Sequence, residues 1–114
     1  MTIDEFQLHK VKRILTEFCN TRIPEHAKSQ IRIDYQIRGN AVTVFENRIH
    51  YRIPDLWTKA KIAQFRYSPD SKLWTLYWWR HTERWYRYEP KKPTSDFADL
   101  LTEVSNDPTG IFWG

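Results

Sequence analysis

The hydrophobic positions of the chain follow two different periods, and the change between them divides the chain into elements. Over residues 3–20, apolar side chains recur at helical spacing and charged side chains fill the opposite side. Helical spacing returns near the end of the chain, at Phe97, Leu100, Leu101 and Val104. Thr2 and Glu5 form a capping-box pattern for the first helix, and Thr94 or Ser95, with Asp96 and Asp99, forms the start of the second. We expect an N-terminal helix and a closing helix that ends at Asn106-Asp107-Pro108.

Between the two helices, apolar and polar residues alternate as they do in strands with one buried face. Such segments cover residues 31–38 and 41–51, joined by the turn-forming pair Gly39-Asn40, and then 61–67, 73–80 and 84–89. The short connections predict local antiparallel pairing. Residues 1–114 are therefore predicted to form one α+β domain, with an N-terminal helix, a five-stranded antiparallel meander sheet and a C-terminal helix. The apolar tail with Phe112 and Trp113 is expected to dock on this domain.

Alternation also divides the aromatic residues of the last two strands between the faces of the sheet. Strand 73–80 sets Trp74, Leu76, Trp78 and Arg80 against Leu73, Thr75, Tyr77 and Trp79, and strand 84–89 sets Trp85 and Arg87 against Arg84, Tyr86 and Tyr88. We expect one face to lie under the N-terminal helix, while the other either receives the closing helix and tail or stays partly open. Trp74, Trp78 and Trp85 are expected in the core, because a small sheet needs large buried side chains.

Positive charge is concentrated in the same part of the chain. The net charge is +4, and residues 59–92 hold nine basic residues against three acidic ones. Aromatic rings beside arginines suit single-stranded nucleic acid, because bases stack on rings while cations neutralise phosphates. Trp, Tyr and Arg are also enriched in protein interfaces, so a protein-interaction module, an accessory or inhibitor subunit or a homodimer using the same surface is the alternative. The candidate binding residues are Arg66, Tyr77, Trp79, Arg80, Arg84, Tyr86, Arg87 and Tyr88.

A second candidate site is the polar cluster of Glu46, Arg48 and His50, which share one face of strand 41–51. A structural ion pair explains Glu46 and Arg48, whereas a catalytic or metal site would need further groups converging from other segments. The four histidines show no metal-ligand spacing, and three glycines do not form a phosphate-binding loop. We therefore expect a binding protein, not an enzyme, with no metal and no cofactor.

Cys19 is the only cysteine, so no internal disulfide can form. The chain shows no signal-peptide pattern and no apolar run long enough to span a bilayer. A cytoplasmic location without membrane association is the expectation.

Short motifs follow one another over roughly the last two thirds of the chain. They are Phe45-Glu46-x-Arg48, Trp57, Ile62-Ala63, Arg66-Tyr67, Trp74-x-Leu76-Tyr77, Trp85 with Tyr88, and Asp107-Pro108-x-Gly110-Ile111-Phe112-Trp113-Gly114. In this order they resemble an uncharacterised bacterial family known only as a domain of unknown function. The resemblance implies no activity.

Overall fold

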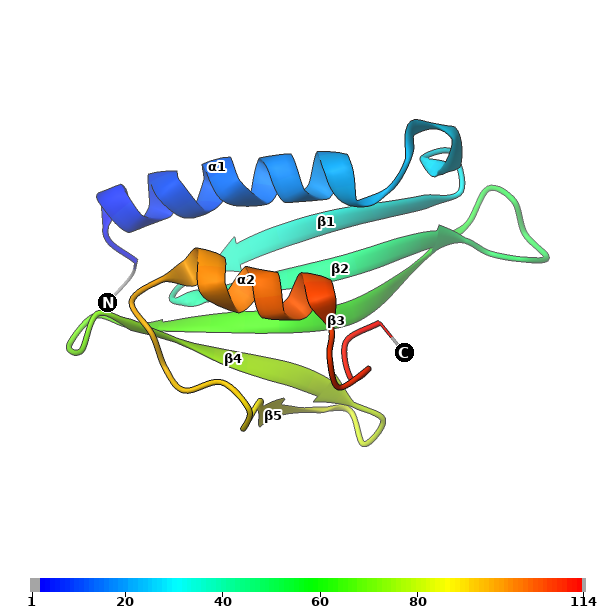
Figure 1. Ribbon diagram of the computed structural model, residues 1–114. Helices are drawn as coiled ribbons and strands as arrows, with labels where there is room; N and C mark the ends of the chain where they lie inside the picture. Colours follow the sequence, from blue (N-terminus) through cyan, green and yellow to red (C-terminus); the bar gives the residue numbers. More distant parts are fainter. Residues whose placement is uncertain (1–2, 114) are drawn as a thin grey trace.

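The computed structural model describes residues 3–113 and confirms the predicted α+β class (Figure 1). A five-stranded antiparallel sheet has its strands in the order of the sequence. The elements are α1 (Glu5–Arg22), the short 3-10 helix η1 (Glu25–Ala27), β1 (Ile31–Arg38), β2 (Ala41–Ile49), β3 (Trp57–Ser68), β4 (Leu73–Arg80), β5 (Arg84–Arg87) and α2 (Phe97–Asn106).

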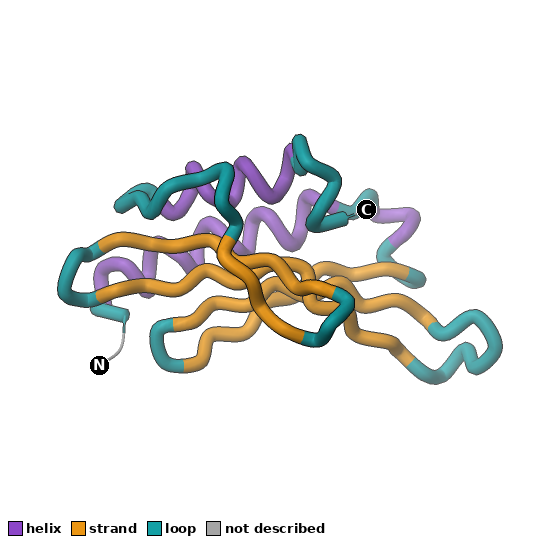
Figure 2. The backbone as a smooth tube through the Cα atoms, turned by 90° about the horizontal axis from the view of Figure 1, so that it is seen from below, coloured by secondary structure: helices purple, strands orange, loops and turns teal. Residues whose placement is uncertain are grey.

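Both helices cover the same face of the sheet (Figure 2). Val11 and Leu15 of α1 are fully buried, and Phe97 of α2 packs on Phe65 and Trp74, with ring centroids 4.7 and 5.0 Å apart. The core thus lies between the helices and one side of the sheet. Of the two arrangements left open by the sequence, α2 joins α1, and the opposite face stays open.

A β-bulge lies in the middle of the sheet. Val44 of β2 pairs with Ala63 of β3, whereas the next residue, Phe45, pairs with Lys61, so Ile62 is an extra residue in β3. Opposite partners in antiparallel strands share a face. The bulge therefore places Lys61 on the open face with Phe45. Lys61 and Gln64 both lie on this face, although an odd number of positions separates them and would place them on opposite faces of a regular strand.

Several element ends differ from the sequence prediction. Trp57 begins β3 four positions before residue 61, because residues 57–60 pair with residues 46–49 of β2 and extend the hairpin. The strands β2 and β5 end at Ile49 and Arg87, two residues earlier than expected. The cap of α1 is Asp4, whose carboxylate accepts a hydrogen bond from the Gln7 backbone at 2.9 Å. Thr2 of the expected capping box lies outside the described residues.

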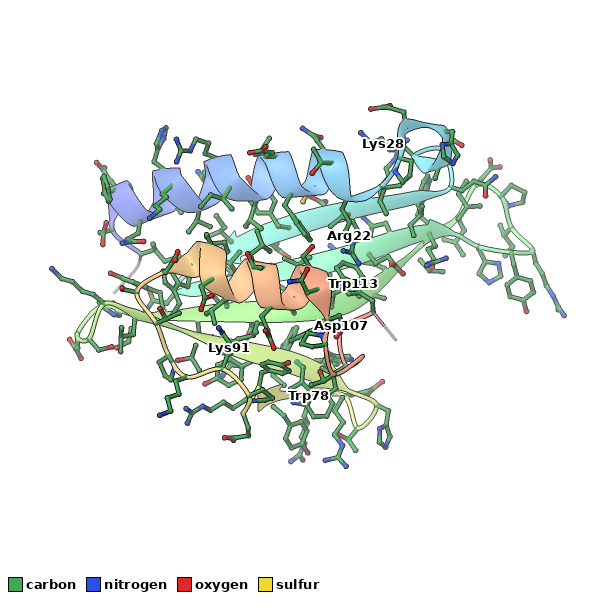
Figure 3. The ribbon with its side chains drawn as sticks, viewed as in Figure 1. Arg22, Lys28, Trp78, Lys91, Asp107 and Trp113 are labelled. Atoms are coloured by element: carbon green, nitrogen blue, oxygen red, sulfur yellow. The ribbon has the colours of Figure 1, made fainter. Side chains whose placement is uncertain are left out.

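The apolar tail docks, as predicted, where α2 ends near α1. Asp107 closes α2 in the left-handed conformation (φ 45°), and its carboxylate accepts the backbone N–H groups of Phe112 (3.1 Å) and Trp113 (2.9 Å). Phe112 is buried against Tyr88, and the Trp113 indole donates to the Val104 carbonyl at 2.7 Å. Figure 3 shows Arg22, Asp107 and Trp113 gathered at this corner, and the Arg22 guanidinium lies 4.3 Å from the Trp113 ring.

Candidate nucleic-acid interface

The open face of the sheet carries most of the excess positive charge of the protein. Strand register places one acidic residue, Asp34, on this face. The same face carries six basic residues, Arg32, Arg38, Lys59, Lys61, Arg66 and Arg87. Their excess of five exceeds the net charge of +4 of the whole chain, so the remainder is close to neutral. This distribution favours a polyanionic partner at the open face.

Aromatic rings alternate with these cations across the open face. The Lys61 Nζ atom lies 3.9 Å from the centre of the Trp79 ring, and the Arg66 guanidinium lies 3.9 Å from that of Tyr77. Lys59 stands 4.0 Å from the Phe45 ring centre. Further rings belong to Trp57, which is 4.9 Å from the Arg32 guanidinium, and to Trp85, which meets Trp79 edge to face with centroids 5.1 Å apart.

The middle of the open face is hollowed. A depression of about 240 Å³ has Phe45 and Trp85 as aromatic walls, Thr43 and Gln64 as polar groups, and Arg38 and Lys61 as its two cations. Gln36 and Ala41 complete the lining. Trp85 of β5 reaches residues of β1 and β2 because the β4–β5 hairpin bends away from the helices (Figure 2). The face is therefore concave where its aromatic and basic residues meet.

The eight binding residues predicted from the sequence divide between the two faces of the sheet. Arg66, Tyr77, Trp79 and Arg87 lie on the open face. The other four, Arg80, Arg84, Tyr86 and Tyr88, lie on the face that carries the helices.

Tyr88 is the clearest correction among these residues. It is 1% exposed and donates from its hydroxyl to Glu103 of α2 at 2.7 Å. Burial is the main cause that raises the pKa of this phenol, with the hydrogen bond to Glu103 second. Tyr88 therefore belongs to the core and cannot contact a ligand at the surface.

The remaining three residues form a separate cluster at the β4–β5 turn. The Arg80 guanidinium lies 5.2 Å from the Tyr86 ring, which also packs near Trp78. A hydrogen bond with Thr82, followed by the charges of Arg80 and Arg84, lowers the pKa of Tyr86. In Figure 3, Trp78 is seen on the side of the sheet that carries the helices. Trp74 is fully buried and Trp78 packs on the core, as expected for both.

Trp85 was wrongly expected in the core. The turn of three residues makes Arg80 the partner of Arg84 and Trp79 the partner of Trp85, so Trp85 shares the open face with Trp79. This relation could have been obtained from the number of residues in the turn, because opposite partners share a face. Lys59 and Lys61 were missed for another reason, because the pattern of apolar and polar residues gives no sign of the bulge at Ile62. Phe45 was missed because alternation within β2 does not show which of its faces continues the face of Trp79.

The polar cluster of β2 contains an ion pair and a separate histidine. Arg48 Nε donates to Glu46 Oε1 at 2.7 Å, and this bond is the main cause that raises the pKa of Arg48. The His50 imidazole instead accepts the backbone N–H groups of Arg52 and Ile53, at 3.1 and 3.2 Å, and stacks on Tyr51. His50 thus stabilises the loop after β2. Within residues 3–113, no three His, Cys, Asp or Glu side chains are grouped as metal ligands would be.

Two other hollows lack the combination found on the open face. One of about 700 Å³ follows a single side of α1 and is lined by residues of that helix alone, so only one wall defines it. Another of about 570 Å³ lies at the far end of the sheet beside His50 and Tyr51. The second hollow contains the cation Arg48 and the rings of His50 and Tyr51, but these come from β2 and the loop that follows it, not from several strands.

The family model for a domain of unknown function, DUF3024, matches residues 3–114. The chain belongs to this family. No curated protein and no solved structure shows significant similarity to it. The closing motif that carried part of the resemblance has a structural role, because Asp107 holds the tail through Phe112 and Trp113. Among residues 3–113, every helix is too short or too polar to cross a lipid bilayer.

Proposed function

We propose that this protein binds single-stranded nucleic acid on the open face of its sheet. The observation that carries the proposal is the alternation of rings and cations on a concave surface, with six basic residues against one acidic residue. Single strands expose both bases and phosphates, so one ligand satisfies both kinds of side chain. A duplex hides its bases and would use the cations alone.

The cations that now lie over the rings do not prevent stacking. An exposed cation–π contact is worth about 0.5–1 kcal/mol, whereas a base stacked on an aromatic side chain contributes about 1–3 kcal/mol. Lys61 can therefore leave Trp79 for a phosphate at a net gain. Arg66 can stay on Tyr77, because a guanidinium plane that covers a ring can itself accept a base on its outer side.

The test is a fluorescence-anisotropy titration with labelled single strands of DNA and RNA and with the matching duplexes, at several salt concentrations. Binding to single strands should weaken with salt, with a slope of about −0.7 per phosphate neutralised. The K61A/R66A double variant should bind more weakly and lower the magnitude of the slope by about 1.4. Trp85→Ala should lose about 5- to 100-fold in affinity through lost stacking.

The K12A/R13A double variant is the matched control, since it removes two exposed cations from α1. It loses the same charge as K61A/R66A but leaves the open face intact, so its affinity should stay close to that of the native protein. Equal losses in the two double variants, or no complex at micromolar protein in low salt, would exclude the proposed site.

A protein-interaction role is the second candidate, and it is favoured by a different observation. The β2–β3 connection exposes large apolar side chains, with Tyr51 81%, Ile53 52% and Leu56 47% exposed, and Trp57 at the start of β3 37%. Solvent-exposed apolar groups gathered on one loop are typical of protein contacts. Sedimentation over a range of concentrations tests for a homodimer that Y51S/L56S would make monomeric. Phe6→Ser, at a residue 77% exposed on α1, is the control.

A further inference from the structure

The polar groups inside the hollow of the open face are fixed by a short hydrogen-bond chain. Arg66 Nε donates to Gln64 Oε1 at 2.6 Å, and Gln64 Nε2 donates to Thr43 Oγ1 at 2.9 Å. Because Arg66 can only donate, the first bond determines which end of the Gln64 amide is the oxygen. The amide therefore has a defined orientation before any ligand arrives.

This chain leaves a specific set of groups for a ligand. Gln64 keeps a second N–H proton on Nε2 and a second lone pair on Oε1. In the part of the chain that the structure describes, the Thr43 hydroxyl accepts from Gln64 and donates to no protein group. The hollow thus offers an acceptor, a donor beside it and a second donor next to the first.

The size and walls of the hollow fit one nucleobase. Its volume of about 240 Å³ is below the roughly 300–1,000 Å³ of pockets for drug-sized ligands. Phe45 and Trp85 supply apolar ring surfaces, and Arg38 and Lys61 supply positive charge for the attached phosphate. A base with its phosphate uses each of these groups.

We propose that the hollow binds one base of a single strand and selects bases that carry a carbonyl, namely guanine, uracil, thymine and cytosine, against adenine. In guanine, uracil and thymine the ring N–H donates to Gln64 Oε1, the carbonyl accepts from Gln64 Nε2, and the second lone pair of that carbonyl oxygen accepts from the Thr43 hydroxyl. In cytosine the amino group donates to Gln64 Oε1, the ring nitrogen accepts from Gln64 Nε2, and the neighbouring carbonyl accepts from Thr43. In adenine a C–H group takes the place of that carbonyl, so Thr43 has no acceptor. This inference rests on the proposed function.

The experiment compares oligonucleotides of about ten residues, made of uridine, cytidine or adenosine, by anisotropy at one salt concentration. The uridine and cytidine strands should each bind roughly tenfold more tightly than the adenosine strand. Thr43→Val keeps the branched shape and removes the hydroxyl, so it should bring both ratios close to one by weakening the binding of the uridine and cytidine strands. Thr75→Val is the control, because Thr75 is also on the open face but outside the hollow.

The outcomes separate this inference from the proposed function. Equal affinities for the uridine and adenosine strands, or a ratio that survives Thr43→Val, overturn the base selection and leave strand binding standing. Absence of binding to any strand overturns both. If free uridine monophosphate competes at the concentrations at which the strand does, base selection is retained and binding of a strand is overturned.

Discussion

The hydrogen bonds of Asp107 predict that the tail contributes substantially to the stability of the whole domain. The Asp107 carboxylate accepts hydrogen bonds from the backbone N–H groups of Phe112 and Trp113. Asp107 is also the residue that ends α2, with φ 45°. Hydrogen bonds to a charged group contribute about 1.5–3 kcal/mol each, and the partial exposure of Asp107 places these at the lower end. Their loss should cost about 3 kcal/mol.

A series of substitutions at Asp107 separates the hydrogen bonds from the backbone conformation. Asp107→Asn keeps one good acceptor and tolerates the left-handed conformation, so it should lower the free energy of unfolding by about 1.5 kcal/mol. Asp107→Gly removes both bonds without strain and should cost about 3 kcal/mol. Asp107→Ala adds about 1 kcal/mol of left-handed strain, for a total of about 4 kcal/mol.

Urea unfolding followed by tryptophan fluorescence measures these values. A domain of 114 residues has roughly 6–17 kcal/mol of stability, so each variant should remain folded in water. Asp70→Ala, at an exposed turn residue, is the control and should change stability by less than about 0.5 kcal/mol. The reasoning is refuted if Asp107→Gly costs less than about 1 kcal/mol, or if Asn is as damaging as Ala.

Four further predictions concern single groups. Burial raises the pKa of Tyr88, so the folded state holds its proton more tightly; stability should therefore fall as pH rises past about 10, and Tyr88→Phe should reduce that fall in urea titrations. Burial is also the main cause that raises the pKa of the Cys19 thiol from 9.0 to about 11, so a disulfide reagent at pH 8 should label the folded protein about a hundredfold more slowly than the protein in urea. Glu46→Gln should cost no more than about 1 kcal/mol in the same unfolding assay, since the guanidinium of its partner Arg48 is exposed. Gly39→Ala should cost about 1 kcal/mol, because φ is +60° there, even though the space around it is open; no loss would show that the turn can change its conformation.

The pattern of apolar residues determined the elements and most of the core. Helical spacing predicted α1 and α2, and alternation correctly divided the residues of β4 between two faces, because each period is a local property of the backbone. The apolar residues Phe112 and Trp113 predicted a docked tail for the same reason: exposed, they would be poorly solvated. These conclusions needed no knowledge of which strand faces which helix.

Only the tertiary structure decided which residues share the candidate site. The pairing of Trp79 with Trp85 and the bulge at Ile62 set which side chains meet across strands, and both helices on one face left the other open. As a result, Tyr88 lies in the core, whereas Trp85 and Lys61 lie on the open face. Alternation within one strand has no information about register between strands, since an extra residue in either strand reverses the faces beyond it.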